Sequence, residues 1–484
     1  MGSVERVELA PGLQVSRVVT GLWQIADMER GGEPVALDRA ASDLGAYAED
    51  GLTTFDMADH YGSAEEVAGE HLSRGGAPEF LTKWVPKPGP ADRDAAVEAV
   101  ERACGRLRME QIPLLQFHAW NYADPSWLDH LAYLDDLRRE GKIAHLGMTN
   151  CDAVHFEMAL DTGIPLRTNQ VCYSLIDRRP AGAMASLCAQ RDVRILAYGT
   201  LAGGFLSDRW LGAPEPALDE ALTWSQMKYK RFIDQAGGWG RFQELLSAVR
   251  RVADRFDVPL ANVASRYVMD QPGVAAVIIG ARPGGRSHRK ETLGLFSFAL
   301  DEEALGTLSE AASRLDPIPG GCGDEYRRPP FLTASGDLSH HLDTMPDPYP
   351  VREVGGRHHV FTGTVWEELA GFSRAVRLGS RIVVSGTTAT HGDRVVGGTS
   401  PTSQTHFVID KIEGALTSLG SGLSDVVRTR VYIRREEDWE AVSRAHGARF
   451  DGVWPANTLV VAEPIGDEYL VEVEAEAQVE EGPS

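Results

Sequence analysis

Short apolar runs alternate with longer segments of helical periodicity along roughly the first 280 residues of the chain. Eight of these runs predict strands, at 18–23, 52–57, 80–85, 114–119, 144–149, 167–173, 194–198 and 274–280. Several segments between them, including 35–49, 93–107 and 127–139, have the spacing of an amphipathic helix. Eight such repeats within about 265 residues predict an α/β fold, a closed parallel (β/α)8 TIM barrel. An open doubly wound sheet would usually have fewer strands and a Gly-x-Gly-x-x-Gly turn, which is absent after the first strand.

A weaker alternating pattern precedes the barrel at 5–20, around the turn formers Pro11 and Gly12. It predicts a short hairpin, which we expect to plug one end of the barrel. Beyond the helical segment 301–314, a Gly/Pro-rich run at 317–350 marks a domain boundary. Part of it, 326–331, is too aromatic and basic for a plain spacer, so we expect it to fold over the barrel mouth.

The remainder of the chain has a different hydrophobic pattern. Strand-like segments at 381–384, 427–433, 459–462 and 469–474 alternate with helical ones at 402–419 and 436–450. This pattern predicts a small α+β domain. We therefore divide the chain into a barrel (1–316), a linker (317–350) and a second domain (351–484), as expected for a chain of 484 residues.

Three consecutive predicted strands each end close to one titratable residue: Asp56, Lys83 and His118. A buried carboxylate is costly without a cationic partner, and Lys83 on the next strand is the candidate partner for Asp56. Tyr61 follows Asp56 by five residues. Each residue alone has an ordinary structural explanation, as a helix cap, surface amine, core histidine or turn aromatic. Four of them together at the end of the barrel where active residues gather favour a catalytic site.

The composition narrows the classes of partner. A formal net charge of −22 and a pI near 5.1 argue against binding to nucleic acid or an anionic membrane, so we expect small-molecule partners. No run of eighteen apolar residues and no signal-peptide pattern occurs, which predicts a soluble, cytoplasmic protein. The five cysteines are scattered and lack Cys-x-x-Cys spacing, so we expect reduced thiols and no metal site.

The segment 282–290 departs from this acidic background, with four formal cations in nine residues directly after the eighth predicted strand. Backbone N–H groups at a helix start and guanidinium groups both favour phosphate. A solvated basic patch is the alternative interpretation.

The barrel resembles the aldo-keto reductase family over about residues 5–345. The resemblance rests on the motif Asp56-x-Ala58-x-x-Tyr61-Gly62 with Glu65, on Lys83 and His118, and on segments 147–150, 169–170, 173–175, 197–204 and 278–282. It implies that Tyr61 is the general acid for a carbonyl oxygen, with its pKa lowered by Lys83, which Asp56 keeps charged. It further implies that His118 orients the substrate carbonyl, and that Trp23 and Trp84 also contact the substrate.

The same resemblance implies NADPH as cofactor, with NADH as the alternative. Side chains of Thr149, Asn150 and Gln170 would hydrogen-bond the nicotinamide carboxamide, and the ring of Tyr198 would stack on it. The remaining cofactor contacts implied by the resemblance are Gly199, Thr200, Leu201 and Gly203, and, around the adenosine phosphate, Gly280, Arg282, Arg286, His288 and Thr292.

The second domain is similar to the RidA/YjgF family, with its chorismate mutase-like fold, over about residues 355–478. The resemblance places Asn457 where imine deaminases of that family have a carboxylate-binding arginine, and Glu472 at a family site glutamate. Asparagine cannot supply a charged bidentate fork, so we expect either a different ligand or an assembly role. The family forms trimers, which implies a homo-oligomer, a trimer through this domain.

These observations predict an NADPH-dependent reductase of aldehydes or ketones fused to a RidA-like oligomerisation or ligand-binding domain. A nucleotide-sensing regulatory protein on the same scaffold is the alternative, and an active deaminase carrying a reductase is a third interpretation. The sequence carries no readable code for the substrate.

Overall fold

The computed structural model describes residues 3–25, 35–219, 221–283, 287–333 and 345–480. Within them, eight parallel strands close a barrel in the order β10-β3-β4-β5-β6-β7-β8-β9, which confirms the predicted TIM barrel. The strands are β3 (Val18–Gly21), β4 (Thr54–Asp56), β5 (Glu79–Trp84), β6 (Ile112–His118), β7 (Ile143–Thr149), β8 (Leu166–Cys172), β9 (Arg194–Tyr198) and β10 (Val274–Gly280).

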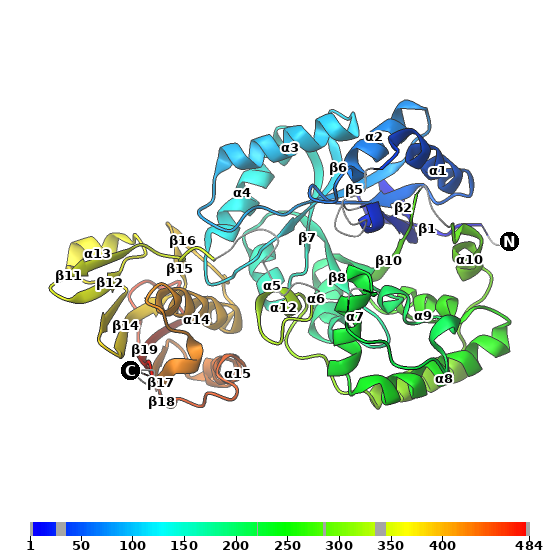
Figure 1. The fold of residues 1–484 in the computed structure, drawn as a ribbon. Coiled ribbons are helices and arrows are strands. Elements are labelled where there is room, and N and C mark those ends of the chain that lie inside the picture. Colours follow the sequence, from blue (N-terminus) through cyan, green and yellow to red (C-terminus); the bar gives the residue numbers. More distant parts are fainter. Residues whose placement is uncertain (1–2, 26–34, 220, 284–286, 334–344, 481–484) are drawn as a thin grey trace.

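Helices surround this barrel (Figure 1). They are α1 (Leu37–Glu49), α2 (Ala64–Ser73), α3 (Arg93–Leu107), α4 (Ser126–Arg139), α5 (Ala153–Asp161), α6 (Ala183–Arg191), α7 (Trp224–Gln235), α8 (Gly238–Phe256), α9 (Leu260–Met269), α10 (Arg289–Leu293) and α11 (Glu302–Ser313). Local sequence sets several of their boundaries. The Asp92 carboxylate accepts the Asp94 N–H at the start of α3, and the Asp152 carboxylate accepts two backbone N–H groups at the start of α5.

The hairpin that precedes the barrel forms as predicted, from β1 (Arg6–Ala10) and β2 (Leu13–Ser16). Its apolar side chains join inward-facing residues of the barrel strands in one buried cluster, which includes Leu9, Leu13, Val15, Leu81, Leu114 and Leu196. The hairpin therefore fills the barrel interior from the side away from the polar strand ends. The opposite end, at the carboxyl ends of the strands, is the one at which active residues gather in barrels of this kind.

A second sheet follows α11 and the short helix α12 (Asp324–Arg327). It has seven strands in the order β11-β12-β13-β14-β19-β17-β18, antiparallel except for the β17–β18 pair. The strands are β11 (Val351–Val354), β12 (Arg357–Val360), β13 (Ala375–Leu378), β14 (Arg381–Thr388), β17 (Val426–Ile433), β18 (Ala456–Val461) and β19 (Val471–Gln478), with a small pair β15 (Thr390–His391) and β16 (Arg394–Val395). The helices are α13 (Val365–Ala370), α14 (Pro401–Thr417) and α15 (Trp439–Arg449). This is the predicted α+β domain.

Helix α14 joins the two domains. It is buried along most of its length, because it contacts β14 and β19 of its own sheet, α15, and α5 of the barrel. Figure 1 shows the second domain to one side of the barrel. At another point of the junction, Asp129 on α4 pairs with His391 (2.9 Å) and Arg394 (3.1 Å) of the second domain. The contact between the domains therefore includes charged pairs.

Candidate active site

Three neighbouring strands bring Asp56, Lys83 and His118 to the same rim. Strand pairing places Asp56 beside Leu81, and Lys83 beside Gln116 of the strand that ends in His118. The Lys83 Nζ donates to Asp56 Oδ2 and to the Met57 carbonyl, both at 2.7 Å. The same Nζ lies 5.1 Å from the centroid of the Tyr61 ring. The ion pair that the sequence predicts between Asp56 and Lys83 is thus formed beside Tyr61.

The second oxygen of Asp56 is bound by two amides. Gln170 Nε2 donates to Asp56 Oδ1 at 2.7 Å, and Gln116 Nε2 donates to the same oxygen at 3.5 Å. Both side chains are buried. A buried carboxylate with a cation on one oxygen and amides on the other is well compensated. Sequence reasoning missed Gln116, although it lies two residues before His118 and therefore points to the same inward face of β6.

Tyr61 is held in an apolar setting. The Trp23 ring, in the 3₁₀ turn Trp23–Ile25 after β3, meets it edge to face with centroids 5.0 Å apart. Burial raises the pKa of Tyr61 well above its ordinary value near 10, and the negative charge of Asp56 raises it further. The net pKa of Tyr61 is thus raised, whereas the sequence predicted that Lys83 would lower it. Lys83 directs its ammonium group at Asp56, and burial lowers the pKa of Lys83 itself, against the opposing effect of Asp56.

His118 lies at the end of β6, with Nδ1 3.4 Å from the Thr149 carbonyl oxygen. Its ring is edge to face with Trp120 (centroids 4.4 Å apart) and with Tyr326 of α12 (5.7 Å). Trp84 does not join this group. Its ring packs against Phe117 and His130, because neighbouring residues of a strand point to opposite faces.

Helix α12 brings charged groups to the rim that sequence reasoning did not identify. Glu325 is buried and pairs with Arg179 at 2.8 Å, and these contacts lower the pKa of Glu325 to about 2 despite its burial. Lys228 of α7 donates to Tyr326 Oη at 2.8 Å and lies 3.7 Å from Glu325. Only the aromatic and basic composition of 326–331 pointed to this segment. Lys228 could not be identified from the sequence, because the residues around it in α7 do not distinguish it from a surface lysine.

The residues assigned to the nicotinamide end of the cofactor lie together at the ends of β7, β8 and β9. Tyr198 Oη donates to Asn150 Oδ1 at 2.7 Å, and Thr149 Oγ1 donates to the Gln170 carbonyl at 3.0 Å. Hydroxyl and amide groups beside an aromatic ring form a donor set that fits a carboxamide and its ring. The residues present therefore fit the cofactor that the resemblance implies.

The loop after β9 packs against α7 and α9. Gly199 has φ +75°, and an added Cβ would lie 2.2 Å from the Tyr229 hydroxyl, so both backbone and space require glycine. Gly203 also has positive φ, and Leu201 packs on the main core. Thr200 is buried, with its hydroxyl 3.1 Å from that of Ser265. These four positions thus have structural roles in addition to their proposed contacts with the cofactor.

The described residues of the basic segment follow β10 and include the start of α10. Gly280 ends β10, Arg282 and His288 are exposed, and Thr292 is buried in α10. His288 pairs with Glu291, three residues further along the chain. The neighbouring residue Arg289 pairs with Asp50, which follows α1, at 2.7 Å. Arg286 lies outside the described residues.

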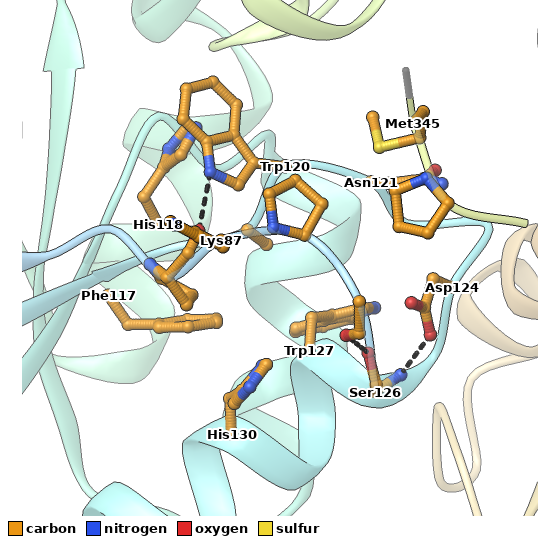
Figure 2. Close-up of a pocket in the computed structure, with 15 residues that line it drawn as sticks. Lys87, Phe117, His118, Trp120, Asn121, Asp124, Ser126, Trp127, His130 and Met345 are labelled. Atoms are coloured by element: carbon orange, nitrogen blue, oxygen red, sulfur yellow. Dashed lines mark hydrogen bonds between the residues drawn. The ribbon is translucent and has the colours of Figure 1, made fainter. Parts of the chain in front are cut away.

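A pocket opens beside His118 (Figure 2). His118 and Trp120 lie at one side of it and Met345 at the other, and Lys87, Trp127 and His130 also line it. A second pocket shares Trp120 and Met345 with the first and extends to Tyr326, Arg328 and Glu413. Because Glu413 belongs to α14, this second pocket is built by both domains.

The two residues singled out in the second domain occupy opposite faces of its sheet. Asn457 pairs with Thr429 of β17 and accepts a hydrogen bond from its hydroxyl at 3.2 Å, on the side covered by α15. Glu472 pairs with Tyr432 of β17, three residues further along, which points to the other face. A single chain therefore does not bring Asn457 and Glu472 together.

Two features are absent from the described residues. None of their helices is long and apolar enough to cross a membrane. Over the same ranges, no cluster of three or more His, Cys, Asp or Glu side chains is arranged to hold a metal ion.

Comparison with known proteins addresses both parts of the chain. Residues 17–313 match the family model described as "Aldo/keto reductase family", and residues 364–479 match the model described as "Endoribonuclease L-PSP". The aldo-keto reductase YhdN of Bacillus subtilis is 27% identical over 344 residues, which cover 66% of this chain and 96% of YhdN. The uncharacterized protein SCO2049 of Streptomyces coelicolor is 43% identical over 119 residues, 24% of this chain and 89% of SCO2049.

A solved structure supports the fold of the barrel. The glycerol dehydrogenase AKR11B4 from Gluconobacter oxydans superposes with a TM-score of 0.54 at 23% identity, covering 66% of this chain and 98% of the dehydrogenase. The match over 17–313 spans more than half of the chain, and the second match confirms the resemblance of the domain after the barrel. The chain belongs to the aldo-keto reductase family and carries a RidA/YjgF-like domain after its barrel.

Proposed function

We propose that the protein reduces an aldehyde or ketone to an alcohol with NADPH as reductant, and that Tyr61 is the general acid. The observation that carries this proposal is the buried Lys83–Asp56 pair at 2.7 Å, with the Lys83 ammonium beside the Tyr61 ring and His118 on the next strand. The cofactor, when bound, supplies the hydride that the carbonyl carbon receives. The chain's own residues supply the proton and hold the substrate.

Tyr61 donates its phenolic proton to the carbonyl oxygen. Its raised pKa keeps the phenol protonated at neutral pH, which is the form that a reduction consumes. The negative charge left on Tyr61 is then compensated by Lys83, whose Nζ lies 5.1 Å from the ring centroid. His118 orients the carbonyl from the opposite side, and the pocket beside it and Trp120 accommodates the rest of the substrate.

The first test uses the purified protein with NADPH and NADH. Binding is followed by quenching of tryptophan fluorescence, and carbonyl compounds are then screened for consumption of the reduced cofactor. We expect tighter binding of NADPH, because Arg282 and Lys290 add positive charge to the rim after β10. Failure to bind either nucleotide would falsify the proposal.

A substitution separates a reductase from a nucleotide-sensing protein. Tyr61→Phe removes the transferable proton and keeps the ring, so we expect turnover to fall by about 10²–10⁴-fold while NADPH binding persists. Tyr133→Phe is the matched control, because Tyr133 lies on α4 and packs against the core. Wild-type protein that binds NADPH and reduces no carbonyl compound would favour the sensing function.

For the second domain, we propose that assembly between chains completes a ligand site. Asn457 and Glu472 lie on opposite faces of one sheet. They can therefore share a site only if Asn457 of one chain lies next to Glu472 of a neighbouring copy. We propose a trimer, with the second domain at its centre. Ammonia release from a panel of imines tests whether this site is catalytic, and Asn457 leads us to expect none from carboxylate-bearing imines.

A further inference from the structure

A buried histidine bridges the two domains. His155 on α5 lies with Nδ1 2.6 Å from Asp152 Oδ2 of the barrel and with Nε2 2.9 Å from Asp410 Oδ2 of α14. The side chains of His155 and Asp410 are 5% and 1% exposed. The two carboxylates raise the pKa of His155 to about 9 against the opposing effect of burial, so the ring is an imidazolium at neutral pH and both nitrogens donate.

The second domain holds its own end of this bridge rigidly. Arg449 of α15 pairs with Asp410 Oδ1 at 2.5 Å and with Glu413 at 2.5 Å. Arg449 is itself buried, and its Nη1 also donates to the His406 carbonyl at 3.2 Å. Asp410 therefore presents one oxygen to its own domain and the other to the barrel.

On the barrel side, the bridge reaches the rim of the active site in two steps. The Tyr122 ring is stacked on His155, with centroids 3.5 Å apart and planes at 6°. The Arg327 guanidinium lies 4.4 Å from the centroid of Tyr122. Arg327 Nε donates to the Ala119 carbonyl at 2.8 Å, and its Nη1 donates to the Asn150 carbonyl at 2.7 Å.

These two carbonyls lie just after the strands β6 and β7, whose ends carry residues of the proposed active site. Ala119 follows His118 at the end of β6, and Asn150 follows β7. Asp152, which binds His155 and caps α5, lies two residues beyond Asn150. Tyr326, which precedes Arg327, faces His118 across 5.7 Å. The contacts from Asp410 thus end on both strand ends and on the helix that closes the mouth.

We propose that Asp410 of the second domain is a positioning residue for the reductase site, acting through His155, Tyr122 and Arg327 on the strand ends at Ala119 and Asn150. The barrel then has its full activity only with the second domain docked. This inference rests on the proposed function for its kinetic readout, and hydrogen exchange provides a readout that does not depend on turnover.

The test compares two substitutions in the full-length protein. Asp410→Asn removes the charge that holds His155 from the second domain. Asp129→Asn breaks a different charged contact between the domains, the one to His391 and Arg394. Among the described residues, Asp129 is not part of the chain of contacts that runs through His155, Tyr122 and Arg327. For Asp410→Asn we expect kcat/KM for carbonyl reduction to fall about tenfold, mainly through KM, and faster amide exchange at 119–123, 150–155 and 323–327. For Asp129→Asn we expect wild-type values in both measurements.

Asp410→Asn also removes one of the two carboxylates that pair with Arg449, so it could destabilise the second domain itself. A second variant distinguishes this effect from loss of the bridge. His155→Gln cuts the bridge and keeps the Asp410–Arg449 pair inside the second domain, and it should reproduce both effects. Asp410→Glu keeps the carboxylate and should restore part of the activity. Wild-type kinetics and wild-type exchange in Asp410→Asn and His155→Gln would overturn the inference, as would a kinetic loss with unchanged exchange at 323–327.

The exchange measurement separates this inference from the proposed function. If the wild-type protein reduces no carbonyl compound, the proposed function fails, whereas faster exchange at 323–327 in Asp410→Asn still supports positioning of the rim. If the wild-type protein is an active reductase and neither measurement changes in the variants, only the positioning by Asp410 fails.

Discussion

The Lys83 ammonium group contacts Asp56 more closely than it contacts Tyr61. Its Nζ makes two contacts of 2.7 Å, to Asp56 and the Met57 carbonyl, and lies over the Tyr61 ring at 5.1 Å. A buried ion pair of this kind compensates its own charges first. The pKa of the Tyr61 phenol is therefore set mainly by its burial and by the nearby carboxylate of Asp56. Both favour the protonated form.

This balance predicts the pH dependence of the proposed reaction. The reactive form of Tyr61 for reduction is the protonated phenol, and a raised pKa moves its loss to a pH above about 10. We expect kcat for carbonyl reduction to stay level between about pH 6 and pH 9, as measured at saturating NADPH in buffers of constant ionic strength. A fall in kcat with an apparent pKa between 7 and 9 would show instead that Lys83 acidifies the phenol.

Asp56, Lys83 and His118 could be predicted from the sequence because each lies at or next to the end of a strand of a recognisable barrel, and Tyr61 because it follows Asp56 by five residues. The direction of the pKa shift of Tyr61 could not, because it depends on burial and on where the Lys83 ammonium points. Glu325 and Lys228 were missed for a related reason. These two residues are about a hundred positions apart in the sequence, and local sequence patterns do not predict contacts between residues so far apart.

Helix α12 packs very closely against the rim of the barrel. Gly323 precedes it with φ +86°, and an added Cβ would lie 2.0 Å from the Asn150 carbonyl oxygen. Such an approach is open only to glycine. The periodicity of the barrel predicted its strands and many of its helices, whereas this four-residue helix has no period of its own. Its place depends on Arg179, Lys228 and the backbone at Asn150.

A matched pair of substitutions tests how closely α12 is fitted to the rim. Gly323→Ala adds backbone strain and a collision with the Asn150 carbonyl, whereas Gly75→Ala adds strain at φ +100° with nothing within 4 Å. We expect Gly75→Ala to lower the free energy of unfolding by about 1 kcal/mol, and Gly323→Ala to lower it further and to raise KM for the carbonyl substrate. Urea unfolding and steady-state kinetics measure the two effects. Equal behaviour of the two variants would mean that α12 shifts without cost.

At the scale of the whole molecule, one chain leaves an apolar surface on the second domain. The exposed apolar residues there include Val460 (42%), Val461 (57%), Trp454 (82%) and Ile465 (82%). Val460 and Val461 lie on β18, which is the last strand of the sheet. An exposed apolar edge strand is available for pairing with another chain, and the opposite faces occupied by Asn457 and Glu472 point to the same need for a neighbour.

We therefore expect the protein to have a mass in solution close to three times its chain mass of 52.7 kDa, as measured by light scattering after size-exclusion chromatography. Val461→Lys places a charge on β18 and should shift the mass toward that of one chain, because lysine on an edge strand opposes pairing. Leu218→Lys is the matched control: Leu218 is 45% exposed and lies on a barrel loop, so the substitution should leave the mass unchanged. If Val461→Lys retains the wild-type mass, β18 is not part of the contact between chains, and a wild-type protein of single-chain mass would remove the basis for a ligand site shared between copies.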